Sequence, residues 1–316
     1  MPAQVRHILC PVDFSEGSRR ALDHAVTLAR RHQARLSVVH VQQLSMPMYG
    51  ASYVGPEGLL QPIVLTDLER QGLLNRLDAE VAEDRMAAHV PIETVLDEAA
   101  NISEAIVSRA HTTSVDLIVI GTHGRSGFER LMLGSVAEKV LRKAGCPVLT
   151  VPPHAPDSVP REAGALRRVL CPVDFSESSK GALDYAAALA REASARLTVL
   201  HVVEPIPALP EYAGAVDMAK LRHECFEHAR TQLSRTVKEF VRDTCATDEL
   251  VLVGRSHAEI LRVAADQAAD LIVLGVRGRG AADLMFFGST TNHVVRGAHC
   301  PVLTVKDESI PSTPAR

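Results

Sequence analysis

An internal repeat constrains the fold of this chain more than any other feature of its sequence. The heptapeptide CPVDFSE occurs at Cys10–Glu16 and again at Cys171–Glu177, and the surrounding stretches His7–Val41 and Arg168–Val202 match without a gap. A second pair of matching stretches closes the two repeats: Asp116–Val151 and Asp270–Val305. Self-similarity over such lengths predicts two copies of one domain, of which the first carries the longer middle segment.

The repeats set the expected domain boundaries. We expect the first domain over residues 1–151 and the second over residues 167–305, each large enough to bury its own core. Residues 152–166 are rich in proline and polar side chains, which predicts a linker. Residues 306–316 form a short polar tail, for which we expect no fixed structure.

Charge and hydropathy exclude several classes of protein. A net charge of −4 and a pI of about 6.4 argue against a nucleic-acid-binding surface or an anionic-membrane surface. No apolar run approaches the roughly 18 residues of a membrane span, and the N-terminus has no signal-peptide pattern. Six cysteines in 316 residues are too few for a disulfide framework. We therefore expect a cytoplasmic protein.

Strand and helix signals alternate in each repeat. In the first, continuous apolar runs predict strands at His7–Val12, Leu36–Val41, Ile92–Leu96, Leu117–Ile120 and Val148–Val151. Helical periodicity predicts helices between them at Ser15–Arg31, Thr66–His89, Ser103–His111 and Ser135–Lys143. Strands that are apolar throughout are typical of a parallel sheet covered by helices on both faces. We therefore predict an α/β protein made of two tandem, doubly wound, parallel-sheet domains.

Two repeated features fall at the carboxyl ends of the predicted strands, where such sheets bind ligands. An aspartate, Asp13 or Asp174, follows the first strand of each repeat. A glycine pattern, G-x₂-G-x₉-G-S, follows the fourth strand with identical spacing in both repeats. Its residues are Gly121, Gly124, Gly134 and Ser135 in the first repeat, and Gly275, Gly278, Gly288 and Ser289 in the second.

The residue types in this pattern favour a phosphate-bearing ligand. Glycines lacking a Cβ let the backbone approach a ligand, and the free N–H groups at a helix start attract an anion. The serine hydroxyl adds a donor, and nearby arginines could contact phosphate oxygens: Arg125, Arg277 and Arg279. An aspartate at the neighbouring strand end could accept hydrogen bonds from ribose or hold a divalent cation.

Structural explanations stand beside this interpretation. Ser135 followed by Glu138 has the pattern of a capping box, which a helix uses with no ligand present. Asp13 could turn the chain through a hydrogen bond to its own backbone, and glycines after a strand often serve only a turn. Repetition of the whole constellation in one register favours a nucleotide site.

The chain resembles a tandem universal stress protein, over His7–Val151 and again over Arg168–Val305. The markers are PVDFSE, the His-Val pair ending the second strand, the G-x₂-G-x₉-G-[ST] pattern and CPVLTV. The resemblance implies five-stranded parallel sheets of the adenine nucleotide alpha hydrolase-like type, related by a pseudo-two-fold axis. It also implies membership of the ATP-binding branch, with ATP (or ADP or AMP) and a Mg²⁺ ion beside Asp13 or Asp174.

The same resemblance implies where the nucleotide binds. Adenine would lie near Val41 or Val202, ribose near Asp13 or Asp174, and the phosphates on the glycine pattern. The implied nucleotide-binding residues are Pro11, Asp13, Val41, Gly121, Thr122, His123, Gly124, Arg125, Gly134, Ser135 and Val136, and Pro172, Asp174, Val202, Gly275, Val276, Arg277, Gly278, Arg279, Gly288, Ser289 and Thr290. No catalytic residue is implied, and we expect no metal site formed by protein alone.

The two predicted nucleotide sites differ in sequence at two places. The third strand-to-helix turn reads Asn101-Ile-Ser in the first repeat, where the family pattern and the second repeat have glycine, as in Gly254-Arg-Ser. The second glycine loop also lacks the Ser126-Gly127 pair. The two affinities need not be equal.

Other motifs give weaker evidence of function. In RHECFEH, His223 and Cys225 point about 200° apart on a helix, so only Cys225 and His228 share a face, too few ligands for zinc. The remaining strand-end cysteines are expected to be apolar fillers: Cys10, Cys146, Cys171 and Cys300. Residues 43–64 could form a lid, a partner-binding surface or an ordinary surface loop.

Three functional hypotheses remain. A Walker A string and a GxSxG elbow are absent, and no G-x-G-x-x-G follows the first strand. The first hypothesis is a nucleotide-dependent adaptor with an unidentified protein partner. The others are a slow Mg²⁺-dependent ATPase and an interaction module with empty sites. We also expect the last strands, Val148–Val151 and Val302–Val305, to pair within the chain as an intramolecular dimer, with a homodimer of whole chains still open.

Overall fold

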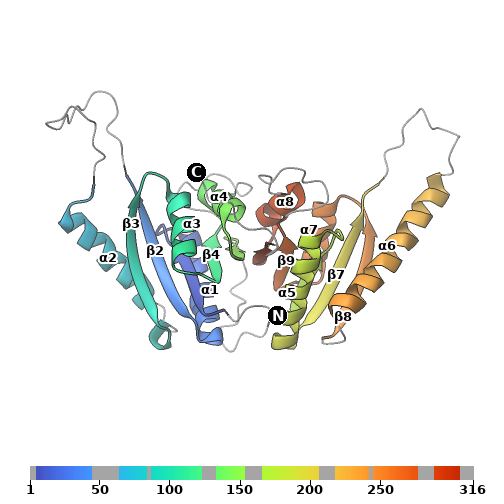
Figure 1. Cartoon of the computed structure of the whole chain (residues 1–316), viewed down its shortest axis with the longest axis horizontal. Coiled ribbons are helices and arrows are strands. Elements are labelled where there is room, and N and C mark those ends of the chain that lie inside the picture. Colours follow the sequence, from blue (N-terminus) through green and yellow to red (C-terminus); the bar gives the residue numbers. More distant parts are fainter. Residues whose placement is uncertain are drawn as a thin grey trace, which may run out of the picture. The chain divides into compact units, whose positions relative to one another are not determined.

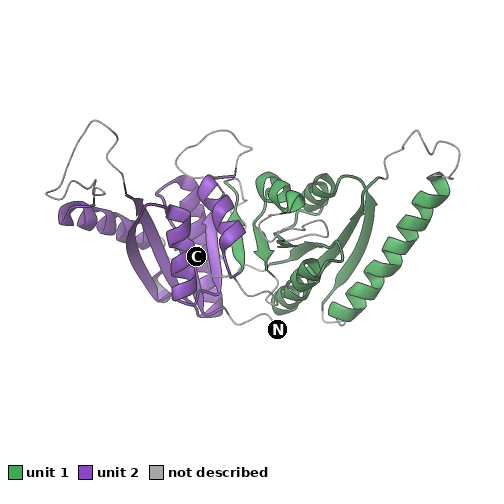
Figure 2. Ribbon diagram, turned by 45° about the horizontal axis from the view of Figure 1, so that its top comes forward, with its two compact units in different colours: residues 1–3, 130–132, 147–316 green, residues 4–129, 133–146 purple. Residues whose placement is uncertain are grey.

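The computed structural model describes residues 5–44, 64–83, 87–122, 133–153, 166–205, 218–241, 245–276 and 288–306 (Figure 1). Helices and strands alternate along both repeats in the order predicted from the sequence. The chain divides into two compact units (Figure 2). One consists of residues 4–129 and 133–146, and the other consists mainly of residues 147–316.

The first unit is built on a parallel sheet with the strand order β3-β2-β1-β4. Its strands are β1 (His7–Pro11), β2 (Arg35–Gln43), β3 (Ile92–Ala99) and β4 (Leu117–Gly121). Its helices are α1 (Glu16–His32), α2 (Asp67–Ala82), α3 (Ile102–Thr112) and α4 (Ser135–Lys143), with a 3₁₀ turn at Ala87–His89. Strand β1 lies between β2 and β4 and is buried along its whole length. The residues that follow β1 therefore lie at the carboxyl end of the sheet, between the ends of its two neighbouring strands.

The second unit repeats this arrangement and adds two strands, β10 and β5. Its order is β5-β10-β9-β6-β7-β8, parallel from β10 to β8. The strands are β5 (Val148–Val151), β6 (Arg168–Pro172), β7 (Arg196–Val203), β8 (Thr247–Val253), β9 (Leu271–Gly275) and β10 (Val302–Val305). The helices are α5 (Glu177–Ala193), α6 (Met218–Phe240), α7 (Ser256–Asp266) and α8 (Ser289–Gly297).

The last strands of the two repeats pair with each other, as predicted. Strand β5 runs antiparallel to β10, and Leu149 lies opposite its own repeat equivalent, Leu303. Thr150 Oγ1 donates a hydrogen bond to the Val302 carbonyl, and Thr304 Oγ1 donates one to the Val148 carbonyl, both at 3.1 Å. The junction is therefore locally two-fold symmetric, and it leaves neither strand as an open edge at this place.

Helix α1 follows directly from its local sequence. The Ser15 hydroxyl caps the helix by accepting a hydrogen bond from Ser18 N at 3.2 Å, and the helix ends at Gln33 with φ 53°. Its buried side chains recur at helical spacing: Ala21, Leu22, Ala25, Val26 and Ala29. Helix α5 is capped in the same way by Ser176 and ends at Ser194, also in the left-handed region.

Helix α2 differs from its prediction. The helix ends at Ala82 rather than His89, and a separate 3₁₀ turn follows at Ala87–His89. Of the apolar residues that recur along it, only Leu77 is fully buried, whereas Leu68 is 84% exposed. Strand β3 is longer than predicted, because its pairing with β2 continues to Ala99. The sequence predicted an amphipathic helix where the structure has one held largely by polar contacts.

The buried cysteines agree with their interpretation as apolar fillers. Cys10 and Cys171 are inaccessible to solvent, and burial raises the pKa of both thiols well above the usual range. Burial also raises the pKa of Cys300 to about 12. Thiols held neutral in this way are poor nucleophiles and poor metal ligands. Cys146 is only half-buried.

The buried environment of His7 should make the free energy of unfolding depend on pH. Its Nε2 lies 2.8 Å from Ser37 Oγ, and burial lowers the pKa of the imidazole below 6.5, with the Arg35 charge acting in the same direction. The unfolded chain takes up a proton near pH 6.5 that the folded chain accepts only at lower pH. His7 therefore contributes stability that is present above pH 6.5 and is lost as the pH falls through its folded-state pKa.

The measurement is urea unfolding between pH 7.5 and pH 5. We expect His7→Gln to flatten the fall in free energy of unfolding below pH 6.5. The control is His299→Gln, at an exposed position. An unchanged slope in the His7 variant would contradict the assignment.

Candidate functional site

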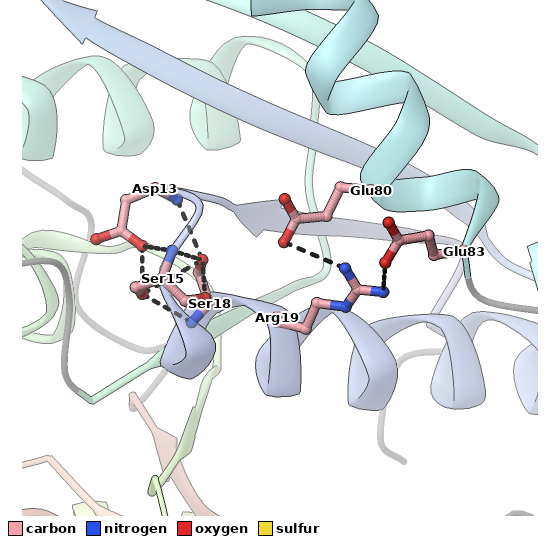
Figure 3. Close-up of polar contacts among 6 residues, drawn as sticks. All are labelled: Asp13, Ser15, Ser18, Arg19, Glu80 and Glu83. Atoms are coloured by element: carbon pink, nitrogen blue, oxygen red, sulfur yellow. Dashed lines mark hydrogen bonds and ion pairs between the residues drawn. The ribbon is translucent and has the colours of Figure 1, made fainter.

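The Asp13 turn lies directly after β1, at the carboxyl end of the sheet (Figure 3). Asp13 Oδ1 accepts hydrogen bonds from Ser15 N at 3.1 Å and from Ser15 Oγ at 2.5 Å, and Asp13 N donates to Ser18 Oγ at 3.3 Å. The proposed backbone turn at Asp13 is therefore confirmed. The second carboxylate oxygen points away from this cluster in Figure 3. One oxygen of Asp13 builds the turn, and the other is aimed elsewhere.

The second repeat forms the same turn. Asp174 Oδ1 accepts from Ser176 N at 3.0 Å and from Ser176 Oγ at 2.5 Å, and Asp174 N donates to Ser179 Oγ at 3.3 Å. Both aspartates are half-buried. The two turns thus present one carboxylate each in the same local geometry.

Gly121, the last residue of β4, lies against the first turn of α1. A Cβ at Gly121 would come within 2.7 Å of the Gly17 carbonyl oxygen, and one at Gly275 within 2.6 Å of the Ser178 carbonyl oxygen. Backbone atoms cannot move aside cheaply, so glycine is needed here for helix–strand packing whether or not a ligand is present. The close approach also brings the Asp13 turn and the end of β4 together.

The glycine loop after each fourth strand is closed at its base. Gly134 N donates a hydrogen bond to the Thr122 carbonyl at 2.7 Å, and Gly288 N donates one to the Val276 carbonyl at 3.3 Å. The helix that follows therefore begins next to the strand end. Thr122 and Val276 are buried, whereas Ser135 and Ser289 are exposed at the helix starts.

The N-cap residues of α4 and α8 supply no side-chain cap. They are Gly134 and Gly288, and among the described residues neither helix start has a side-chain capping hydrogen bond. The capping box suggested by Ser135 and Glu138 is wrong, because Ser135 is the first helical residue and cannot serve as the cap. The N-cap residue of α7, Arg255, supplies no cap either, but Glu204 Oε1 accepts hydrogen bonds there from Ser256 N at 3.4 Å and from Ser256 Oγ at 2.7 Å. In contrast, side chains cap four other helices: Ser15 on α1, Thr66 on α2, Asn101 on α3 and Ser176 on α5.

Some predicted site residues fall outside the described part of the chain. They are His123, Gly124, Arg125, Arg277, Gly278 and Arg279, together with the Ser126-Gly127 pair and most of segment 43–64. The remaining predicted residues lie on the carboxyl sides of adjacent strands or at the following helix starts: Pro11, Asp13, Val41, Gly121, Thr122, Gly134, Ser135 and Val136, and Pro172, Asp174, Val202, Gly275, Val276, Gly288, Ser289 and Thr290.

The third strand-to-helix turns align differently from the prediction. Helix α3 begins one residue after Asn101, and helix α7 begins one residue after Arg255. Asn101 therefore corresponds to Arg255, and Gly254 corresponds to Ala100, so the predicted pairing of Asn101 with Gly254 is wrong by one residue. Asn101 Oδ1 accepts a hydrogen bond from Glu104 N at 3.4 Å, which makes it a helix cap.

The sequence analysis missed a contact between a phenylalanine ring and a histidine ring beside each aspartate. The Phe14 and His40 ring centroids lie 4.6 Å apart, and His40 Nδ1 lies 2.8 Å from the Val12 carbonyl. The equivalent pair, Phe175 and His201, is 4.3 Å apart. A signal was present, because the phenylalanine and the histidine both belong to repeated motifs.

Metal and membrane features can be judged for the described ranges. There, no group of three or more His, Cys, Asp or Glu side chains is placed to hold a metal ion. Within the same part of the chain, no helix combines the length and the apolar character that crossing a membrane requires.

Comparison with known proteins identifies the family. Residues 4–152 and 165–306 match the pattern of the Universal stress protein family. This chain is a member of the universal stress protein family. Two family domains in tandem account for the repeat and for the paired last strands.

Some known universal stress proteins are similar to this chain over its whole length, and others are similar over about one domain. Universal stress protein E of Photorhabdus laumondii is 24% identical over 97% of this chain and 96% of its own length. Universal stress protein MJ0531 of Methanocaldococcus jannaschii is 36% identical over 46% of this chain and 81% of its own length. The crystal structure of a universal stress protein from Archaeoglobus fulgidus has a TM-score of 0.65 at 21% identity, covering 96% of this chain and 97% of that one, which shows a shared fold.

Proposed function

We propose that this universal stress protein binds ATP at two sites, one in each repeat, and acts as a nucleotide-dependent adaptor in a stress response. The observation that carries the proposal is the pair of helices α4 and α8, whose N-cap residues are both glycines that supply no side-chain cap. A helix start leaves N–H groups without intrahelical partners, and these groups with the helix dipole favour an anion. The closed base of each glycine loop holds this helix start next to the fourth strand.

The chain's own residues fit such a ligand. The N–H groups at Ser135 and Val136, and at Ser289 and Thr290, would bind phosphate oxygens, with the Ser135 and Ser289 hydroxyls as further donors. The second carboxylate oxygen of Asp13, and its counterpart on Asp174, would accept from ribose hydroxyls or hold Mg²⁺. Bound ATP would supply the negative charge that these donors attract.

An adaptor role agrees with the chemistry around the site. Asp13 and Asp174 each use one oxygen to hold a turn, an arrangement that orients a ligand. We therefore assign these residues to binding. Exchange of ATP for a smaller nucleotide would change the occupancy of the α4 and α8 helix starts, and through this the surface offered to a protein partner.

The proposal is tested by extracting the purified protein for co-purified adenine nucleotide and by titrating ATP calorimetrically. We expect two bound nucleotides per chain, and we expect Gly124→Val with Gly278→Val to remove binding while circular dichroism stays unchanged. Absence of ATP or ADP together with no binding on titration would overturn the proposal and favour an interaction module with empty sites. Phosphate release over many turnovers, lost in Asp13→Ala with Asp174→Ala, would instead identify a slow ATPase.

A further inference from the structure

The residue after each site aspartate has an unusual backbone conformation. Phe14 has φ 62° and Phe175 has φ 64°, in the left-handed region that bulky side chains rarely adopt. The same strained conformation occurs at the same motif position in both repeats. Strain of this kind persists only where the surroundings hold it, and it concentrates at binding sites.

Contact with the tilted His40 ring holds Phe14 in the first repeat. His40 is buried, and the contact of its Nδ1 with the Val12 carbonyl fixes the imidazole against the Phe14 ring. Because Asp13 and Ser15 flank Phe14, a fixed Phe14 also fixes the direction of the Asp13 carboxylate. Phe175 and His201 form the same contact, with His201 Nδ1 at 2.7 Å from the Val173 carbonyl.

Helix α2 adds a contact to the first ring pair. The Arg76 guanidinium carbon lies 4.1 Å from the centroid of the Phe14 ring, within the range of a cation–π interaction. Burial raises the pKa of Glu80 on the same helix, and the charges of Arg19 and Arg76 oppose that rise while Asp13 adds to it. The charges of α2 therefore act on the Asp13 turn.

Helix α2 is held in place mainly by charged and polar contacts. Arg19 of α1 pairs with Glu80 at 3.9 Å and with Glu83 (Figure 3), and Arg70 pairs with Glu98 of β3. Asp78 accepts a hydrogen bond from Thr94 at 2.6 Å, and Leu77 is the one fully buried side chain among the described residues of the helix. Ion pairs between partly exposed side chains weaken as salt increases.

The second repeat secures its equivalent helix differently. Lys180 occupies the position of Arg19 but pairs with Glu177 of its own helix at 2.7 Å. Helix α6 instead buries apolar side chains along its second half, Ala229, Leu233 and Val237, and Val241 directly after the helix is buried as well. Salt should therefore affect the two repeats unequally.

We propose that Arg76 is a positioning residue for the first nucleotide site: by holding Phe14, it fixes the turn that aims Asp13, so affinity there depends on the docking of α2. This inference rests on the proposed function. The second repeat has the equivalent Phe175–His201 ring contact, and its helix α6 buries apolar side chains where α2 is attached by ion pairs. The first site is thus the one that responds to ionic conditions, or to any partner that displaces α2.

The experiment compares the two sites in one chain. Gly288→Asp leaves only the first site active, and Gly134→Asp leaves only the second. In the first-site protein we expect Arg76→Met to weaken ATP binding about three- to fivefold, Arg76→Lys to restore most of it, and Arg76→Met to reduce the salt dependence of affinity. In the second-site protein, Arg76→Met should change nothing.

Amide hydrogen exchange tests the positioning role of Arg76 in the absence of nucleotide. Arg76→Met in the full chain should speed amide exchange at residues 13–18 and leave residues 174–179 unchanged. Equal affinity in the Arg76→Met first-site protein, or an equal loss at both sites, would overturn the inference. If the unaltered chain binds no ATP, the proposed function fails, and unchanged exchange at residues 13–18 would then overturn the positioning role as well.

Discussion

Replacing Gly134 and Gly288 with aspartate is expected to abolish ATP binding while leaving both helices at least as stable as before. The N-cap residues have φ −58° and −54°, which an L-residue adopts without strain. An aspartate there would accept hydrogen bonds from the helix N–H groups and place a negative charge where a phosphate would bind. Losing two charge-assisted hydrogen bonds of about 1.5–3 kcal/mol each lowers affinity by roughly 100-fold or more.

The measurement pairs calorimetric ATP titration with thermal unfolding. We expect the helix caps to raise stability by a few tenths of a kcal/mol relative to glycine. The matched control is Gly134→Asn with Gly288→Asn, which supplies a cap of the same shape without the charge and should weaken binding less. Full ATP affinity in the aspartate variant would refute the assignment of phosphates to these helix starts.

Replacing Gly121 or Gly275 with alanine is expected to destabilise its own unit by about 1–3 kcal/mol. The added Cβ would meet backbone carbonyl oxygens at 2.7 Å and 2.6 Å, so the first turn of α1 or α5 must move away from the sheet. Valine at either position should cost more, because the branched side chain cannot fit beside the helix backbone.

The chain provides a matched control for each substitution. A Cβ added at Gly72 in α2 or at Gly181 in α5 would meet no neighbouring atom within 4 Å, so alanine there should stabilise the helix by about 0.5–1 kcal/mol. Urea unfolding of the four single variants gives the comparison. Equal stability of Gly121→Ala and Gly72→Ala would show that the strand–helix contact is looser than the structure has it.

These expectations separate two roles that the glycine pattern combines. The first glycine is required by packing, so its presence alone does not indicate a ligand. The third glycine, at Gly134 or Gly288, leaves a helix start uncapped, which costs stability unless another group satisfies it. The second of these roles is the one that favours an anion.

The parallel sheets could be predicted because their central strands are continuous apolar runs, as in HILCP of β1 and LIVIG of β4. The bounds of α4 and β5 were predicted without error, since a glycine and a proline delimit them. Helix α2 was less predictable, because no proline or glycine marks its end at Ala82. Its apolar residues recur at helical spacing in the sequence, but ion pairs rather than burial of those residues attach the helix, so the periodicity did not locate its end.

Sequence alone predicted the features of the candidate site that are set by residue type. It did not predict those that are set by backbone conformation or by contacts between distant residues. Asp13 and the glycine pattern were found because they repeat at fixed spacing. The strain at Phe14 was not, because a positive φ at phenylalanine has no sequence signature. The contact of Arg76 with Phe14 joins positions far apart in the sequence.

The self-complementary junction of β5 with β10 has an evolutionary consequence. Strands β5 and β10 pair within one polypeptide, so each strand meets its partner at an effective concentration of about millimolar or above. This concentration does not depend on the expression level. Identical subunits must change together, but fused copies need not. Arg168 stands where His7 stands, and Lys180 where Arg19 stands. Fusion thus lets the two halves differ at positions that identical subunits would have to share.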